Sequence, residues 1–161
     1  MYDENKAHYV VVTCIVVKDE KFLITKRAST EKAFPNQWTV PGGTLETSDY
    51  INMPKDTSQH WYNVLENLIR REVLEETGLK IKNIRYLTSL IYVHSDKTPV
   101  LIISLYADYD SGKVRLSSEL TEHAWINLEE AKKYELIEGI YKELQMLDKV
   151  LEGEEAGEWK K

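Results

Sequence analysis

The chain has 161 residues, enough for one domain to bury a core without disulfides or structural metals. Its net charge of -6 argues against general binding to nucleic acids or acidic membranes, because both favour a basic surface. The apolar runs are far shorter than the ~20 residues that cross a bilayer, and no N-terminal export signal is evident.

The N-terminal third of the sequence predicts short strands separated by polar turns. Residues 8–18, which are rich in Val and Ile, and residues 21–27 predict the two strands of a hairpin. Residues 37–40 predict a short strand that Pro41-Gly42-Gly43 stops. Loops are expected at residues 28–36 and 45–60.

A helix is predicted over residues 61–77, where apolar residues recur with helical spacing. Gly78 follows it at the position where a left-handed glycine commonly ends a helix. Two longer strands are expected at residues 81–93 and 100–109. The later expected elements are a loop at 116–122, a strand at 124–126, a helix from Leu128 with Asn127 as its N-cap, an amphipathic helix at 137–151 and a charged, frayed tail at 152–161.

Strands and helices intermix in this pattern without strict alternation. It predicts a fold of the α/β (α+β) class, with a mixed β-sheet and helices packed on its faces. We expect a single domain over residues 1–161, with its core between residues 8 and 151. Cys14 is expected to be a small buried hydrophobe in the first strand. Because it has no partner for an internal disulfide, the cytoplasm is the expected location.

The predicted helix has an apolar stripe that consists of Trp61, Leu65, Leu68 and Ile69. Three carboxylates, Glu72, Glu75 and Glu76, fall where this stripe should continue. At spacings of i, i+3 and i+4 they are neighbours, so mutual repulsion and partial burial should raise their pKa values. Oxygen ligands clustered in this way suit a hard divalent cation, with magnesium favoured. A solvated, Glu-rich helix end is the alternative that spacing alone leaves open.

These residues resemble a known family. The segment 71–79, REVLEETGL, matches the second half of the Nudix box, REUXEEXGU, at every specified position. Residues 41–46 resemble the PGGxxE segment that opens the box, and residues 22–27 resemble the basic-ended strand before it. Glu119, six residues before Trp125, is similar to a loop acid and tryptophan of several members. The resemblance spans about residues 8–130 and implies an α/β/α sandwich, a mixed sheet flanked by helices.

The chain departs from the family's pattern at one place. Seven residues usually separate the first glutamate of the box from its arginine, but 21 residues (50–70) separate Asp49 from Arg71. We interpret residues 50–60 as an insertion before the helix, which could form a lid over the site. The first box carboxylate is therefore in question. Asp49 is the first choice for it and Asp56 the alternative.

The resemblance implies Mg²⁺-dependent hydrolysis of a diphosphate linkage, in which water attacks an NDP-X substrate to give NMP and phosphorylated X. Mn²⁺ is the alternative metal. Glu75 and Glu76 would be metal ligands, and Glu72 would be either a ligand or the base that activates water. A backbone carbonyl of Gly42 or Gly43 would complete the coordination, since glycine lets the chain approach an ion closely.

Other residues would complete the site by resemblance. Glu119 is a further candidate for a ligand or general base, and Glu122 follows it. Arg71 is expected to form a structural ion pair with Glu46 that supports the site.

Three residues are candidates for binding substrate. Lys26 and Arg27 would bind phosphate, but adjacent strand residues point to opposite faces, so only one is expected in the site. Arg27 fits the resemblance better. Trp38 would either stack on a base or lie in the core.

Two other functions stay open at this stage. One is a Nudix-like module that binds a nucleotide or sugar nucleotide without cleaving it, although such a module would be expected to lose box carboxylates. The other is isoprenoid diphosphate isomerisation, which expects an active-site cysteine, whereas Cys14 lies away from the box. The expected partner is a small nucleotide-like diphosphate, and the segment before the box most resembles that of enzymes acting on nucleoside triphosphates. A homodimer is also expected, and neither nucleic acid nor membrane is an expected partner.

Overall fold

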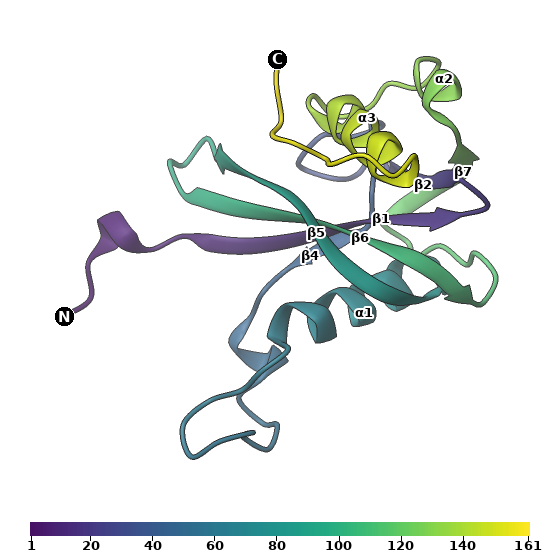
Figure 1. Cartoon of the computed structure of the whole chain (residues 1–161). Helices are drawn as coiled ribbons and strands as arrows, with labels where there is room; N and C mark the ends of the chain where they lie inside the picture. The colour runs from purple at the N-terminus through teal and green to yellow at the C-terminus, as the bar shows by residue number, and fades with distance from the viewer.

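The computed structural model describes residues 1–161 and centres on a mixed seven-stranded sheet (Figure 1). Its strands are β1 (Tyr9–Lys18), β2 (Lys21–Arg27), β3 (Trp38–Thr39), β4 (Gly42–Thr44), β5 (Lys80–Val93), β6 (Pro99–Ser111) and β7 (Leu120–Ile126). Its helices are α1 (Val64–Thr77), α2 (Leu128–Ala131) and α3 (Ile140–Leu151), with 3-10 turns at Glu4–Lys6 and Thr47–Asp49.

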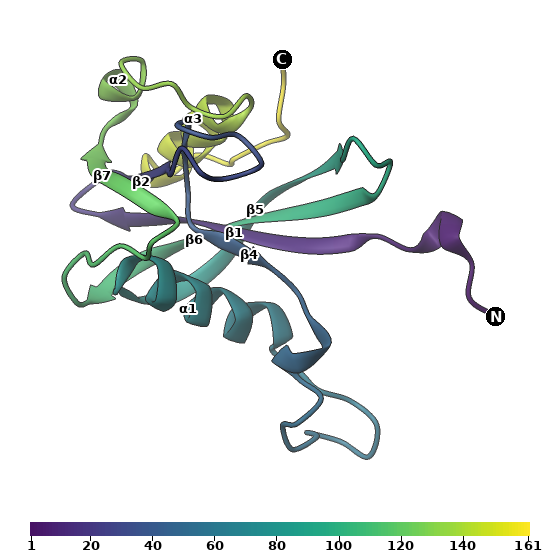
Figure 2. The same cartoon turned by 180° about the vertical axis from the view of Figure 1, so that it is seen from behind.

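The central strand is β1, which runs parallel to β6 and antiparallel to β2 and β4. The main path of the sheet is β3-β2-β1-β6-β5, and β7 pairs with β2 outside this path. Figure 2 shows α1 on one face of the sheet, with α2 and α3 on the other. The α/β/α sandwich that the resemblance implied is confirmed.

Successive side chains of β2 point to opposite faces of the sheet, so this strand contributes to both layers of the core. Phe22 and Ile24 belong to the apolar cluster under α3, whereas Leu23 belongs to the cluster under α1. All three side chains are fully buried, as expected for a strand covered by helices on both faces. Cys14 is fully buried in β1, and burial raises the pKa of its thiol. The prediction of a small buried hydrophobe is therefore confirmed.

The segment after Pro41 differs from the sequence-based prediction. It does not simply stop a strand, because Gly42–Thr44 forms β4 and pairs with β1. The two chains approach so closely that a Cβ atom on Gly42 would lie 2.5 Å from the carbonyl oxygen of Val12. Strand β7 also begins earlier than predicted, at Leu120, because its polar half pairs with β2.

Helix α1 begins at Val64 rather than at residue 61. The preceding Asn63 adopts a left-handed conformation with φ of 56°, which separates Trp61 from the helix. Trp61 instead packs against Tyr50, with ring centroids 5.3 Å apart, and its Nε1 donates to the carbonyl of Met53. Trp61 is therefore not part of the apolar stripe of the helix. At the other end, Gly78 is left-handed, as predicted.

The insertion at residues 50–60 forms an ordered loop at the N-terminal end of α1. The carboxylate of Asp56 accepts the backbone N–H of Tyr62 at 2.8 Å, and Lys55 lies over the Trp61 ring. The loop projects away from the sheet (Figure 2), whereas the box carboxylates lie in the C-terminal half of α1. In this structure the loop does not cover them, and the lid stays a prediction.

The C-terminal region follows the prediction with two differences. Asn127 caps α2 by accepting the N–H of Glu130 at 2.8 Å, as expected. Helix α3 begins at Ile140 rather than at residue 137, because Gly139 is left-handed with φ of 98°. The tail is not frayed at Trp159, whose Nε1 donates to the carbonyl of Gly139 at 3.2 Å. None of the helices is long and apolar enough to span a membrane.

Glu143 of α3 is a buried acid, only 7% exposed. Burial raises the pKa of its carboxyl above the ordinary 4.5, and the nearby Ser104 hydroxyl only partly offsets this. Because the folded chain holds this proton more tightly than the unfolded chain, the stabilisation is present at low pH and lost as pH rises through the folded pKa. We therefore expect Glu143→Gln to stabilise the protein by an amount that grows from mildly acidic to neutral pH. Urea unfolding at both pH values measures this, and a pH-independent difference would contradict it.

Candidate active site

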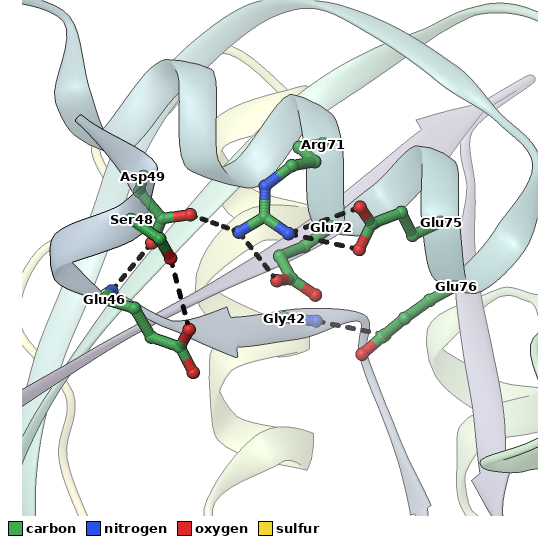
Figure 3. A network of polar contacts seen from close by, with 8 residues as sticks. All are labelled: Gly42, Glu46, Ser48, Asp49, Arg71, Glu72, Glu75 and Glu76. Atoms are coloured by element: carbon green, nitrogen blue, oxygen red, sulfur yellow. Dashed lines mark hydrogen bonds and ion pairs between the residues drawn. The ribbon is translucent and has the colours of Figure 1, made fainter. Parts of the chain in front are cut away.

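The C-terminal half of α1 packs against β4 and brings the box acids close to it, with Glu76 directed at Gly42 (Figure 3). Oε2 of Glu76 accepts the backbone N–H of Gly42 at 3.3 Å. Glu72 lies so close to Gly43 that a Cβ atom there would be 2.3 Å from its Cδ. A larger residue than glycine at position 43 would therefore displace Glu72.

Arg71 joins the acids of the helix to the turn before the insertion (Figure 3). Its guanidinium donates to Asp49 at 2.5 Å and to Glu75 at 3.1 Å, and it lies 3.2 Å from Glu72. The carboxylate of Asp49 also accepts the N–H of Glu46 at 2.7 Å. Asp49, first choice for the missing box carboxylate, thus lies in the network.

The expected ion pair between Arg71 and Glu46 was wrong. Glu46 instead accepts a hydrogen bond from Ser48 at 3.4 Å, because the 3-10 turn that follows it directs Asp49 toward the helix. The sequence carries no standard capping signature here, because Glu46 rather than Ser, Thr, Asp or Asn precedes the turn. Asp56, the alternative first carboxylate, is engaged within the insertion.

The three box acids differ in exposure. The side chain of Glu72 is 16% exposed, whereas that of Glu75 is 57% exposed. The buried face of α1 contains Ile69, Val73 and Thr77, so it is rotated away from Glu75. The prediction that the acids extend the buried stripe is therefore right for Glu72 and Glu76 and wrong for Glu75.

Burial and repulsion between carboxylates govern the electrostatics of this site. The pKa of Glu76 is raised to about 8, mainly by burial; the charges of Glu72 and Glu119 contribute to this rise, while the Gly42 N–H and Arg27 oppose it. Burial also raises the pKa of Glu72 against the effect of Arg71. Glu119 acts on both acids, so the turn before β7 contributes negative charge to this site.

The two basic residues at the end of β2 have different partners. Lys26 forms an ion pair with Glu122 at 3.1 Å. Arg27 donates from Nε to the carbonyl of Ala33 at 2.8 Å, and its charge acts on Glu76. Of the two, Arg27 is the one whose charge is felt by the box acids.

Trp38 lies on β3 and packs against the connection between α2 and α3. Its ring makes an edge-on contact with Tyr134, with centroids 4.8 Å apart, and its backbone bonds to Glu135 and Ile137. It is half-buried beside the core cluster under α3. Of the two readings left open by the sequence, this packing favours a core residue.

The box acids fit a divalent metal ion in their chemistry. They supply oxygen donors, which hard cations prefer, and the partly buried charge on Glu72 and Glu76 is only partly balanced by Arg27 and Arg71. Their present directions differ, since Glu72 and Glu75 turn to Arg71 and Glu76 turns to Gly42. Accordingly, no three acidic, histidine or cysteine side chains converge as a preformed metal site.

The profile of the NUDIX domain matches residues 7–147 of the chain. The chain belongs to the Nudix family. The NAD-capped RNA hydrolase NudC of Actinobacillus succinogenes is 36% identical to it over 90 residues, which are 49% of this chain and 33% of that protein. The chain therefore matches about a third of the length of this curated relative.

Solved Nudix structures share the fold. The MutT protein from Methanosarcina mazei Go1 superposes with a TM-score of 0.67 at 22% identity, covering 91% of this chain and 96% of that one. The Nudix domain of Shewanella oneidensis NrtR, solved with ADP ribose, gives 0.64 at 18% identity, covering 94% and 93%. At these identities the likeness shows that the Nudix sandwich is common to all three chains.

Proposed function

We propose that this Nudix domain hydrolyses the diphosphate linkage of a nucleotide, a nucleoside triphosphate or related NDP-X compound, with Mg²⁺ or alternatively Mn²⁺. The observation that carries the proposal is the placement of Glu72 and Glu76. Both acids are partly buried, both press against the glycines of β4, and their charge is incompletely balanced. Such a site is costly to keep unless a cation and phosphates use it.

The ligands of the metal would be Glu72, Glu75 and Glu76, with the backbone carbonyl of Gly43. Glu75 is the most exposed of the three acids and is held by Arg71. When bound, the ion would neutralise phosphate charge and lower the pKa of a bound water.

The remaining groups would orient and activate the reactants. Arg27 would bind a phosphate, because its guanidinium matches phosphate oxygens in pairs. Water would attack one phosphorus atom, the bridging P–O bond would break, and the water proton would pass to a carboxylate. Glu119 and Glu72 are the candidates for this base. Arg71, which is paired with Asp49, would position Glu72 and Glu75.

The comparisons support the class of substrate. The NAD cap of the RNA named for the NudC relative and the ADP ribose bound to the NrtR domain both contain a nucleoside joined through a diphosphate. NDP-X compounds of this kind have the linkage that the proposed chemistry cleaves. The cytoplasmic location and the homodimer stay predictions from the sequence.

A second candidate function is nucleotide binding without cleavage. The ADP ribose complex of the NrtR Nudix domain is compatible with it, because it shows a domain of this fold with a nucleotide bound. The presence of Glu72, Glu75 and Glu76 favours hydrolysis instead, because binding alone does not require them.

A product-release screen tests the proposal. The purified chain is incubated with Mg²⁺ or Mn²⁺ and nucleoside triphosphates (oxidised ones included), ADP ribose, NAD, sugar nucleotides or dinucleoside polyphosphates. We expect turnover of one class, and its loss in Glu75→Gln with the fold intact. Binding of a nucleotide without turnover would replace the hydrolase by the sensor, and full activity in Glu75→Gln would refute the proposed ligand set.

A further inference from the structure

A cavity of about 430 Å³ lies between β5, the start of α3 and the C-terminal tail. It is lined by residues 88–90 of β5, by Glu138 and Gly139, by Glu143 of α3 and by Trp159 of the tail. Helix α3 and the tail lie on the face of the sheet opposite α1 (Figure 1). The box acids of α1 do not line this cavity.

Glu143 is the unusual residue of this lining. It is 7% exposed, it takes part in none of the ion pairs of the protein, and no Lys, Arg or His lines the cavity with it. The neighbouring hydroxyl of Ser104 is fully buried and has no hydrogen bond of good geometry. A fully buried hydroxyl without a partner beside a buried acid without a counter-ion is rare in native proteins, and the pair indicates a ligand that the protein chain itself does not supply.

Trp159 gives the cavity an aromatic wall. Its Nε1 donates to the carbonyl of Gly139 at 3.2 Å, which holds the tail against the start of α3. The side chain stays 41% exposed, and an indole face attracts cations. Glu138 adds a second carboxylate beside it. The lining thus combines negative charge, hydroxyl groups and an indole with no positive charge.

We propose that this cavity binds a small organic cation that carries a primary ammonium group on a short alkyl chain. The ammonium donates hydrogen bonds to Glu143, the buried acid that has no cationic partner in the chain, and Trp159 covers the alkyl chain. A bare metal ion would leave the indole wall and Leu90 without a contact, so an alkylammonium fits the lining better. The proposal does not rest on the hydrolase activity.

Titration calorimetry of the full chain with 1,4-diaminobutane tests this site, with butane-1,4-diol as the uncharged probe. We expect saturable binding of the diamine and none of the diol. Glu143→Gln should weaken binding about tenfold or more, since hydrogen bonds to charged groups are the stronger ones. Trp159→Leu should weaken it about threefold through loss of the cation–π contact.

The matched control is Glu155→Gln, which removes one exposed acid from the same tail outside the cavity lining. This variant should bind the diamine as the wild type does. Glu143→Gln is expected to be at least as stable as the wild type, so its loss of binding cannot come from unfolding, and thermal melts check this. Absence of saturable diamine binding, equal binding by Glu143→Gln, or equal binding of the diol would overturn the proposal.

Discussion

Glu76→Gln is expected to lower kcat of the proposed hydrolysis about a thousandfold, because the proposed metal ion loses a charged ligand and the reacting phosphates are neutralised less well. The folded state should lose no stability. The amide oxygen of glutamine can still accept the N–H of Gly42, which Glu76 accepts at 3.3 Å, and the variant carries no partly buried charge. Kinetics on the substrate found in the screen, together with urea unfolding, measure both effects.

Glu66→Gln is the matched control, because it makes the same change on the same helix outside the box. It should leave kcat within about twofold of the wild type, because Glu66 lies in the first turn of α1, at the opposite end of the helix from the box acids. If Glu76→Gln kept wild-type activity, or if both variants lost it equally, Glu76 would not act in the reaction.

Local chemistry explains which parts of the fold were predictable. The Val- and Ile-rich run of β1 is buried between two layers of helices, and such a strand shows as a continuous apolar segment. Gly78 and Asn127 end and begin helices through interactions within a few residues, so their roles are visible in the sequence.

The missed elements depend on contacts between distant segments. Strand β4 exists because Gly42 and Gly43 can lie against β1, and nothing local distinguishes this from a turn. The start of α1 depends on Trp61, whose apolar side chain fits a helical stripe but finds Tyr50 across the insertion. Tertiary packing therefore overrode the helical pattern at this end.

The candidate site likewise combines residues that local spacing predicted with contacts that only the fold brings together. The spacing of Glu72 and Glu76 placed both on the inner side of α1, because helical geometry relates neighbours along one turn. The partner of Arg71 lies 22 positions earlier, at Asp49, and only the folded turn brings the two together. Exposure of Glu75 likewise follows from the rotation of α1 on the sheet, which the spacing of its residues leaves undetermined.

The two glycines of β4 give the second large expected effect, since alanine at each should damage a different property. In Gly43→Ala the new Cβ would lie 2.3 Å from Cδ of Glu72. The end of that side chain can move away, so we expect a small change in stability. The displaced carboxylate should lower kcat about a hundredfold, as misplacement by an ångström does elsewhere.

In Gly42→Ala the new Cβ would instead lie 2.5 Å from the backbone oxygen of Val12 and 3.0 Å from Cγ2 of Thr13. Strands β4 and β1 would have to separate, at a cost of about 1–3 kcal/mol, as overpacking does in cores. Neither glycine has positive φ, so both effects come from space alone. Urea unfolding and kcat of the two variants should therefore diverge. A stable, inactive Gly42→Ala together with an unstable Gly43→Ala would contradict the arrangement of β4 between β1 and the box helix.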